Sequence, residues 1–179
     1  MCILDHDTVG AADKFGNIFI LRTPELVNED VDTGSGQQML WDQGKLSGAP
    51  NKVDLLTHYY LGEVITSLTK CCLIPGGVEV MIASTIMGGL YAFIPFTSKE
   101  DVKLFQHLEM FMRQECPNLC QRDHLSYRSY FQPVKDTIDG DLCEKYATMS
   151  VAKQKELASD VDRTPTEMMK KLEEIRSVM

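Results

Sequence analysis

The stretch RDHLSYRSYFQPVKDTIDGDLCE, from Arg122 to Glu144, lies at the junction between two parts of the chain that have different sequence patterns. Up to about residue 97, short runs of strand-forming residues alternate with glycine and proline turns, and beyond that point apolar residues recur at helical spacing. The stretch itself concentrates aromatic rings, arginines and aspartates, the residue types from which active sites are built. Its role decides between an enzyme and a scaffold.

The first part of the chain has the pattern of antiparallel strands. Runs rich in Val, Ile, Tyr, Phe and Thr are separated by tight-turn sequences such as Pro75-Gly76-Gly77 and Gly88-Gly89. The expected strands cover residues 2–9, 15–22, 53–60, 63–74, 79–86 and 90–96. The strands from 53 to 96 have the length and spacing of one propeller blade, with a small barrel as the alternative.

Two further features concern the ends of this part. Residues 24–50 are polar and contain an acidic cluster, which predicts a long surface loop with Leu40 and Trp41 as candidate anchors. The first residues, Met1 to Asp5, open directly into a strand pattern without a cap or linker. Unpaired sheet edges invite aggregation, so we expect a fragment of a larger protein or an obligate subunit.

The second part of the chain has the pattern of four helices. Ser98-Lys-Glu-Asp101 predicts a capping box, with Asp in place of the usual Glu, on a helix that ends near Cys116-Pro117. A second helix is expected from Asp141, which would accept from the first-turn amides while Glu144 bonds back. A third is expected after Ser150.

The fourth helix is expected to open at Thr164-Pro165-Thr166-Glu167, with proline at the first helical position, where its missing N–H costs nothing. Glu167 and Lys171, four residues apart, predict an ion pair on its flank. Its apolar face would carry Met168, Leu172, Ile175 and Met179.

The composition limits the classes of function. The chain of 179 residues is 44% hydrophobic and 25% charged, which is ordinary for a folded domain and excludes a disordered chain. Its formal net charge of -8 repels a phosphate backbone and disfavours autonomous nucleic-acid binding. The six cysteines come without a secretory signal pattern and predict reduced intracellular thiols. The apolar run from Ile86 to Phe96 is much shorter than the roughly 20 residues of a membrane span.

The aspartates around Gly140 raise a metal hypothesis, because paired carboxylates suit Mg²⁺ or Ca²⁺. The spacing of Asp136, Asp139 and Asp141 does not fit a calcium-binding EF-hand loop. The structural interpretation explains more: Asp139-Gly140 makes a turn and Asp141 caps the following helix.

Other arrangements of reactive residues are weaker. Cys116, Cys120 and His124 recur at four-residue intervals with His107 upstream, but Pro117 breaks the helical register that a zinc site would need. The paired thiols Cys71-Cys72 lie in an apolar strand without the cationic neighbours of a redox site.

A nucleophilic triad has little support either. Ser126, His124 and Asp123 are too close in sequence to imply triad geometry, and the chain has no Gly-x-Ser-x-Gly elbow.

The aromatic and arginine set Tyr127, Arg128, Tyr130 and Phe131 supports the sharpest binding hypothesis, because such side chains stack on bases. The surrounding acids and the junction position favour another interpretation. The arginines would bridge carboxylates or helix C-termini between the two halves of the chain, and the tyrosines would pack half-buried.

Several strings along the whole chain match one family. The sequence resembles the C-terminal end of the splicing factor 3b subunit 3 family, part of the ribonucleoprotein that recognises the intron branch site. The strings that carry the resemblance are Asp13-Lys-Phe-Gly-Asn17, Leu40-Trp-Asp42 with Gly44, Ile74-Pro-Gly-Gly77, Pro95-Phe-Thr-Ser98, RDHLSYRSYF from Arg122, IDGDLCE from Ile138 and DRTP from Asp162.

The wider superfamily includes the large subunits of the damaged-DNA-binding complex and of the cleavage and polyadenylation specificity factor. Its Arg-Ser and Ile-Asp-Gly-Asp-Leu elements correspond here to Arg128-Ser129 and Ile138 to Leu142. The resemblance implies β-propellers followed by a helical C-terminal domain. Residues 1–97 would then be the terminal blade or blades of a propeller and residues 98–179 the helical domain, with a structural junction motif at Arg122, Arg128, Tyr130, Asp139, Gly140 and Asp141.

The resemblance also implies a function. The chain would be part of a nuclear, non-catalytic scaffold without cofactor or metal, holding splicing factor 3b subunit 1, a helical-repeat protein, and the small subunit 5, with pre-mRNA nearby. One alternative is a scaffold in a DNA-damage ubiquitin-ligase or polyadenylation complex. A second alternative, from another class, is a metal-dependent hydrolase centred on Asp136, Asp139 and Asp141.

Overall fold

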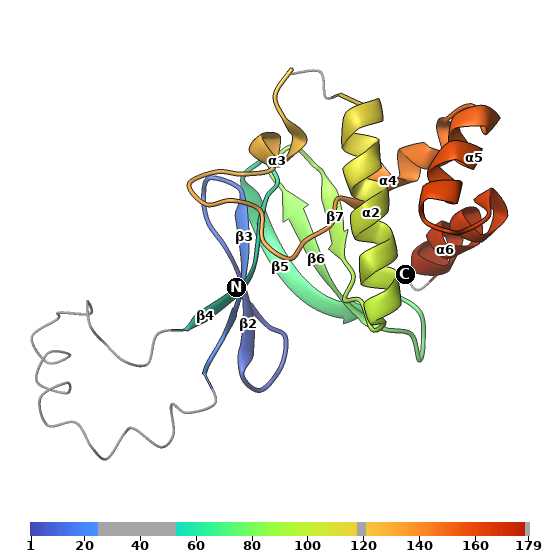
Figure 1. Cartoon of the computed structure of the whole chain (residues 1–179). Coiled ribbons are helices and arrows are strands. Elements are labelled where there is room, and N and C mark those ends of the chain that lie inside the picture. Colours follow the sequence, from blue (N-terminus) through green and yellow to red (C-terminus); the bar gives the residue numbers. More distant parts are fainter. Residues whose placement is uncertain (25–52, 118–120, 178–179) are drawn as a thin grey trace, which may run out of the picture.

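The computed structural model describes residues 1–24, 53–117 and 121–177. It consists of a β part followed by a helical part, with α2 lying between the sheets and the last two helices (Figure 1). The long loop expected at residues 24–50, with Leu40 and Trp41, lies outside the described residues apart from Pro24. Within the described ranges, no helix has the length and apolar character needed to cross a membrane.

The first sheet is an antiparallel meander in the order β1-β2-β3-β4. Its strands are β1 (Cys2–Ile3), β2 (Thr8–Ala12), β3 (Asn17–Arg22) and β4 (Asp54–Tyr60). The single strand expected at 2–9 is wrong, because Asp5 to Asp7 form a turn between two strands. Asp5 accepts the His6 amide at 2.8 Å, and the carbonyl of Thr8 accepts from the amide of Leu4 at 3.0 Å.

The second sheet has the order β5-β6-β7, from β5 (Ile65–Cys72), β6 (Glu79–Thr85) and β7 (Leu90–Phe93). Grouping residues 53–96 into one four-stranded sheet is therefore wrong. β4 pairs with β3 instead, in a register that sets Tyr60 opposite Asn17. Gly62, with φ of +85°, then turns the chain toward the second sheet, a conformation that glycine adopts without a steric penalty.

The two sheets pack face to face on an apolar core. Ile18, Tyr59 and Leu61 come from the first sheet and its end, and Met81 and Ala83 come from β6. The sheets approach closely beside Gly10, where a Cβ atom would lie 2.7 Å from the Met81 Sδ. Lys70 of β5 adds a polar connection, since its Nζ donates to the Leu4 carbonyl at 2.6 Å.

The helices begin mostly where the sequence predicts. They are α2 (Lys99–Glu115), α3 (His124–Tyr127), α4 (Gly140–Glu144), the 3₁₀ helix η2 (Lys145–Thr148), α5 (Val151–Asp160) and α6 (Pro165–Ser177). Ser98 caps α2 as expected, since its Oγ accepts the Glu100 amide at 3.2 Å, but the Asp101 side chain of the expected capping box pairs with Lys171 instead. The helix ends at Glu115, with Cys116 as its C-cap. The expected start of α6 is confirmed: Thr164 N donates to Glu167 Oε2 at 2.9 Å and Glu167 N to Thr164 Oγ1 at 3.3 Å.

Two details of the helical expectations are wrong. The N-cap of α4 is Asp139, whose Oδ1 accepts from the Leu142 amide at 3.3 Å, so the cap lies two residues before Asp141. Lys171 does not pair with Glu167. It lies 3.2 Å from Asp101 Oδ1 and 2.8 Å from Glu174 Oε2, because Asp101 of α2 faces α6.

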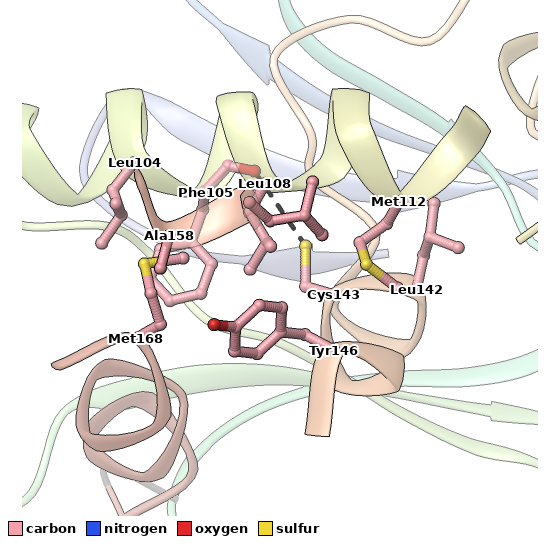
Figure 2. Packing of buried hydrophobic residues seen from close by; sticks show 10 residues of the cluster. Leu104, Phe105, Leu108, Met112, Leu142, Cys143, Tyr146, Ala158 and Met168 are labelled. Carbon is pink, nitrogen blue, oxygen red and sulfur yellow. Dashed lines mark hydrogen bonds between the residues drawn. The ribbon is translucent and has the colours of Figure 1, made fainter. Parts of the chain in front are cut away.

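The helical part has a core of its own, shown in Figure 2. Leu108 and Met112 on α2 are 1% and 0% exposed, and they pack with residues of α4, η2, α5 and α6. Tyr146 is fully buried and donates its hydroxyl to the Gln154 carbonyl at 2.9 Å. Cys143 points its thiol toward the Phe105 carbonyl at 4.0 Å (Figure 2). The last helices are thus docked on α2 and not independent.

We expect Leu108→Ala to lower the free energy of unfolding by about 2–5 kcal/mol, because it removes buried methyl groups and leaves a cavity. Met110→Ala on the same helix is the matched control, since Met110 is 44% exposed, and its effect should stay within about 0.5 kcal/mol. Urea denaturation followed by circular dichroism measures both. Equal losses for the two variants would contradict the packing described for α2.

Candidate functional site

The segment 121–139 is here called the junction segment. It contains α3, then passes along the β part and leads to α4 (Figure 1). It attaches to the outer edge of β4. Lys135 and His58 exchange two backbone hydrogen bonds of 3.0 and 3.1 Å, and the Tyr60 amide donates to the Arg128 carbonyl at 3.2 Å. The junction segment therefore extends the first sheet before the chain enters the helical core.

A buried ion pair lies at the centre of this segment. Arg128 Nε donates to Asp139 Oδ2 at 2.9 Å, and the two side chains are 13% and 4% exposed. The other carboxylate oxygen of Asp139 caps α4 at Leu142, and its own amide donates to Glu109 Oε1 of α2 at 3.2 Å. Asp139 thus connects two elements of the helical part, α2 and α4, to Arg128.

Aromatic rings enclose the ion pair. The guanidinium carbon of Arg128 lies 5.2 Å from the ring centre of Tyr59 on β4 and 5.1 Å from that of Tyr127 on α3. His124 Nε2 lies 3.0 Å from Asp139 Oδ2, although it is not aligned as a hydrogen bond. Arg128 thus touches the β core through Tyr59 and the helical part through Asp139.

The charges of the pair follow from these contacts. Burial alone would raise the pKa of Asp139, but the charge of Arg128 and its hydrogen bond bring the net pKa below the ordinary value. Burial, reinforced by the nearby Asp139 carboxylate, raises the pKa of Tyr59 far above its usual range. Asp139 is therefore ionised and Tyr59 neutral near pH 7, which does not suit either group to proton transfer there.

A second group of rings is partly exposed. Tyr130 stacks on Tyr60 with centroids 5.1 Å apart, and it contacts Phe15 of the β2–β3 turn at 5.8 Å and Phe131 at 4.3 Å. Phe131 is 81% exposed and has φ of 65°, an uncommon backbone conformation for a bulky residue. These four residues form the exposed aromatic cluster.

The remaining residues of the predicted junction motif lie apart from the ion pair. Arg122 is exposed, and Asp141 is exposed in the first turn of α4. Gly140 is the first residue of α4, and a Cβ atom placed there would meet nothing within 4 Å. The prediction that Asp139-Gly140 forms the turn and Asp141 the cap is therefore wrong, because Asp139 itself caps the helix.

The residues proposed for chemistry do not assemble. In the parts of the chain that the structure describes, no group of three or more His, Cys, Asp or Glu side chains could hold a metal ion. Asp136 is exposed, whereas Asp139 is buried against Arg128. Ser126 is exposed on α3, and Cys120 of the zinc hypothesis lies outside the described residues. The buried Cys143 has a raised pKa because of burial and of nearby Glu109, so its thiol stays protonated.

Several residues of the site were not predicted. Glu109 is 4% exposed inside α2, where it bonds Arg113 Nη2 at 2.8 Å and the Asp139 amide. Tyr59 and His58 lie in a run with the period of a strand, and nothing in that run distinguishes contact with the junction segment from ordinary core packing. The sequence holds one signal for this role of Glu109, namely that a charged residue occupies a core position in the apolar pattern of α2.

Comparison with known proteins gives this arrangement a family. Residues 1–148 match the family model described as the CPSF A subunit region, and the chain belongs to that family. It is 52% identical over 177 residues to splicing factor 3B subunit 3 of Danio rerio and 54% identical over 176 residues to that of Drosophila melanogaster. It is also 43% identical over 175 residues to pre-mRNA-splicing factor prp12 of Schizosaccharomyces pombe. Each match covers 97–98% of the chain, which spans only 14% of the length of these relatives.

We expect Asp139→Asn to destabilise the chain by about 3 kcal/mol at pH 7, because it leaves the buried Arg128 without its counter-charge. Asparagine still caps a helix, so the loss isolates the ion pair. Since the pKa of Asp139 is lowered in the fold, its contribution is present above about pH 4 and is lost as the pH falls through the folded value.

Denaturant titrations between pH 7 and pH 3 measure this difference. Asp141→Asn, an exposed change two residues away, is the control and should shift stability by no more than about 0.5 kcal/mol. A difference between wild type and Asp139→Asn that stays constant down to the lowest pH would contradict the assignment.

Proposed function

We propose that the chain is part of a non-catalytic scaffold subunit of the splicing factor 3b complex, acting in pre-mRNA splicing in the nucleus. The proposal is supported by relatives about half identical in sequence that carry the name splicing factor 3B subunit 3. The relative prp12 is likewise named a pre-mRNA-splicing factor. The names describe those longer proteins, and we extend them to this chain.

The observation that carries the scaffold proposal is the ion pair between Arg128 and Asp139. The acid with the most enclosed position in the junction segment is neutralised by an arginine and used as a helix cap. An acid in this state holds elements together and is not available as a general base. The residues that first suggest an active site thus account for the connection of a sheet to a helical domain.

We further propose that residues 1–97 are terminal blades of a β-propeller and residues 98–179 a helical C-terminal domain. The four-stranded meander β1 to β4 has the strand number of a propeller blade. The second sheet has three described strands and leaves the outer edge of β7 for a further strand. The separate apolar cores of the sheets and of the helices support a boundary near α2.

The proposed partners are splicing factor 3b subunit 1, a helical-repeat protein, and the small subunit 5. Direct contact with RNA is not part of the proposal, because the net charge of -8 opposes it. The runner-up is a scaffold of a ubiquitin-ligase or polyadenylation complex, which the CPSF A subunit family match favours over unrelated functions.

Affinity purification from nuclear extract tests the proposal. We expect the tagged chain to recover subunits 1 and 5, and the recovery to survive nuclease treatment, because the contacts are between proteins. Asp139→Asn should recover less at equal bait concentration, because its junction is weakened, whereas Asp141→Asn should match wild type. Recovery of a cullin or of polyadenylation factors in place of splicing subunits would overturn the choice of complex.

Elemental analysis of the same purified chain separates the scaffold from the hydrolase alternative. We expect less than stoichiometric Mg²⁺, Mn²⁺ or Zn²⁺, because Asp136, Asp139 and Asp141 do not converge and Asp139 already pairs with Arg128. Stoichiometric metal in the wild-type chain that is lost in Asp139→Asn would contradict the proposal of a scaffold without a metal ion.

A further inference from the structure

His58 on β4 is a fully buried ionisable residue that the ion pair does not use. It is 0% exposed, and its ring lies 5.0 Å from the ring of Phe19 on the neighbouring strand. Its two ring nitrogens each face one oxygen: Nδ1 lies 3.0 Å from the Pro133 carbonyl oxygen and Nε2 lies 3.2 Å from Asn17 Oδ1. It therefore connects β3 to the junction segment through side-chain contacts.

The identity of the oxygen on each side matters. A backbone carbonyl only accepts, so the Pro133 contact requires a proton on Nδ1. The Asn17 side chain has an acceptor and a donor end, and its orientation is set by its other neighbour. Asn17 Nδ2 donates to Asp13 Oδ2 at 2.6 Å, which leaves the amide oxygen facing His58.

Asp13 is fixed as an acceptor. Its Oδ1 accepts from the amides of Phe15 and Asn17, both at 2.9 Å. Burial alone would raise the pKa of Asp13, but the bonds from the Asn17 side chain and these amides bring it below the ordinary value. Turning the Asn17 amide over would place two oxygens 2.6 Å apart, so the orientation that satisfies Asp13 presents oxygen to His58.

The two contacts of the His58 ring need two N–H donors, which is one proton more than a neutral imidazole carries. A neutral imidazole carries one N–H and one bare nitrogen, but both nitrogens here face oxygen atoms that accept. We propose that His58 is held in the folded chain as an imidazolium that donates to Asn17 and Pro133, so that attachment of the junction segment to β4 is linked to the uptake of one proton.

The surroundings agree with this assignment. The groups around His58 are Asn17 and Phe19 of β3, Asp13 reached through Asn17, the Pro133 carbonyl, and the backbone of Lys135, whose ammonium group binds the Leu55 carbonyl. Asp13 supplies a negative charge one hydrogen-bonded group away, and the positive charge of Lys135 is directed elsewhere. Removal of the proton would leave a lone pair against an oxygen in a site without exposed surface.

The linkage has a definite sign. Above about pH 6.5 an unfolded histidine is neutral, whereas the folded chain keeps the extra proton. The folded state then binds more protons than the unfolded state, so stability falls as the pH rises until the folded imidazolium loses its proton. The attachment of the junction segment should weaken in the same direction.

Nitrogen NMR of the histidine side chains in the wild-type chain tests the proposal directly. The chain has four histidines, and the signals are assigned by elimination with His6→Gln, His107→Gln and His124→Gln. At pH 7 we expect both ring nitrogens of His58 to show the shifts of protonated nitrogens. One nitrogen with the shift of a bare nitrogen would overturn the proposal. This measurement changes neither residue 13 nor residue 58, so it decides the question whatever those variants do.

Asp13→Asn provides a second test with an opposite prediction. Asparagine at 13 can donate to the Asn17 oxygen, which frees the Asn17 amide to turn and donate to a neutral His58. We therefore expect His58 to be neutral at pH 7 in this variant. Between pH 7 and 8, the unfolding equilibrium constant of wild type should rise by about tenfold per pH unit more than that of Asp13→Asn. Asp5→Asn, which removes the same charge from the β1–β2 turn, is the control and should follow wild type. Parallel pH curves for wild type and Asp13→Asn would overturn the linkage.

Discussion

The structure depends on the cost of burying a carboxylate. Asp139 is placed where the chain passes from the sheets to the helices, and a buried charge there is tolerated only with a partner and satisfied hydrogen bonds. Arg128 supplies the opposite charge, and the Leu142 amide donates to one carboxylate oxygen of Asp139. The Glu109 carboxylate accepts from the backbone amide of Asp139. Each of these partners belongs to a different local structure. Their arrangement supplies one buried acid with an opposite charge and with hydrogen bonds.

This requirement explains why two separate apolar cores act together. Among the residues that the structure describes, the sheet core around Ile18 and Met81 and the helical core around Leu108 and Tyr146 share no buried residue. The connection between them is polar and aromatic: Arg128 lies over Tyr59 of the sheet core and bonds Asp139 at the start of α4. Polar contacts depend on geometry more strongly than apolar packing does, so this junction fixes an orientation that two apolar surfaces alone would leave loose.

Local sequence signals predicted the elements well and their partners poorly. The capping sequences at Ser98 and Thr164 mark the starts of α2 and α6, because a cap depends only on residues two or three positions apart. The assignment of β4 to the first sheet could not be predicted, since every strand in the region has the same alternating pattern and pairing with β3 depends on long-range packing. Likewise, Asp139 and Asp141 are both acceptable caps by sequence, and the burial of Arg128 selects the first. Glu109 and His58 could not be predicted as parts of the junction, because their partners Asp139 and Pro133 lie 30 and 75 positions away in the sequence.

The attachment of the junction segment to β4 also bears on the order in which the chain folds. His58 and Pro133 are 75 positions apart, whereas the hairpins and helices close over much shorter stretches. Contacts between distant positions pay a larger loop-closure entropy and form late. A newly made chain would therefore complete its sheets and α2 first, and until the segment closes over β4, that strand edge would be open to pairing with other chains.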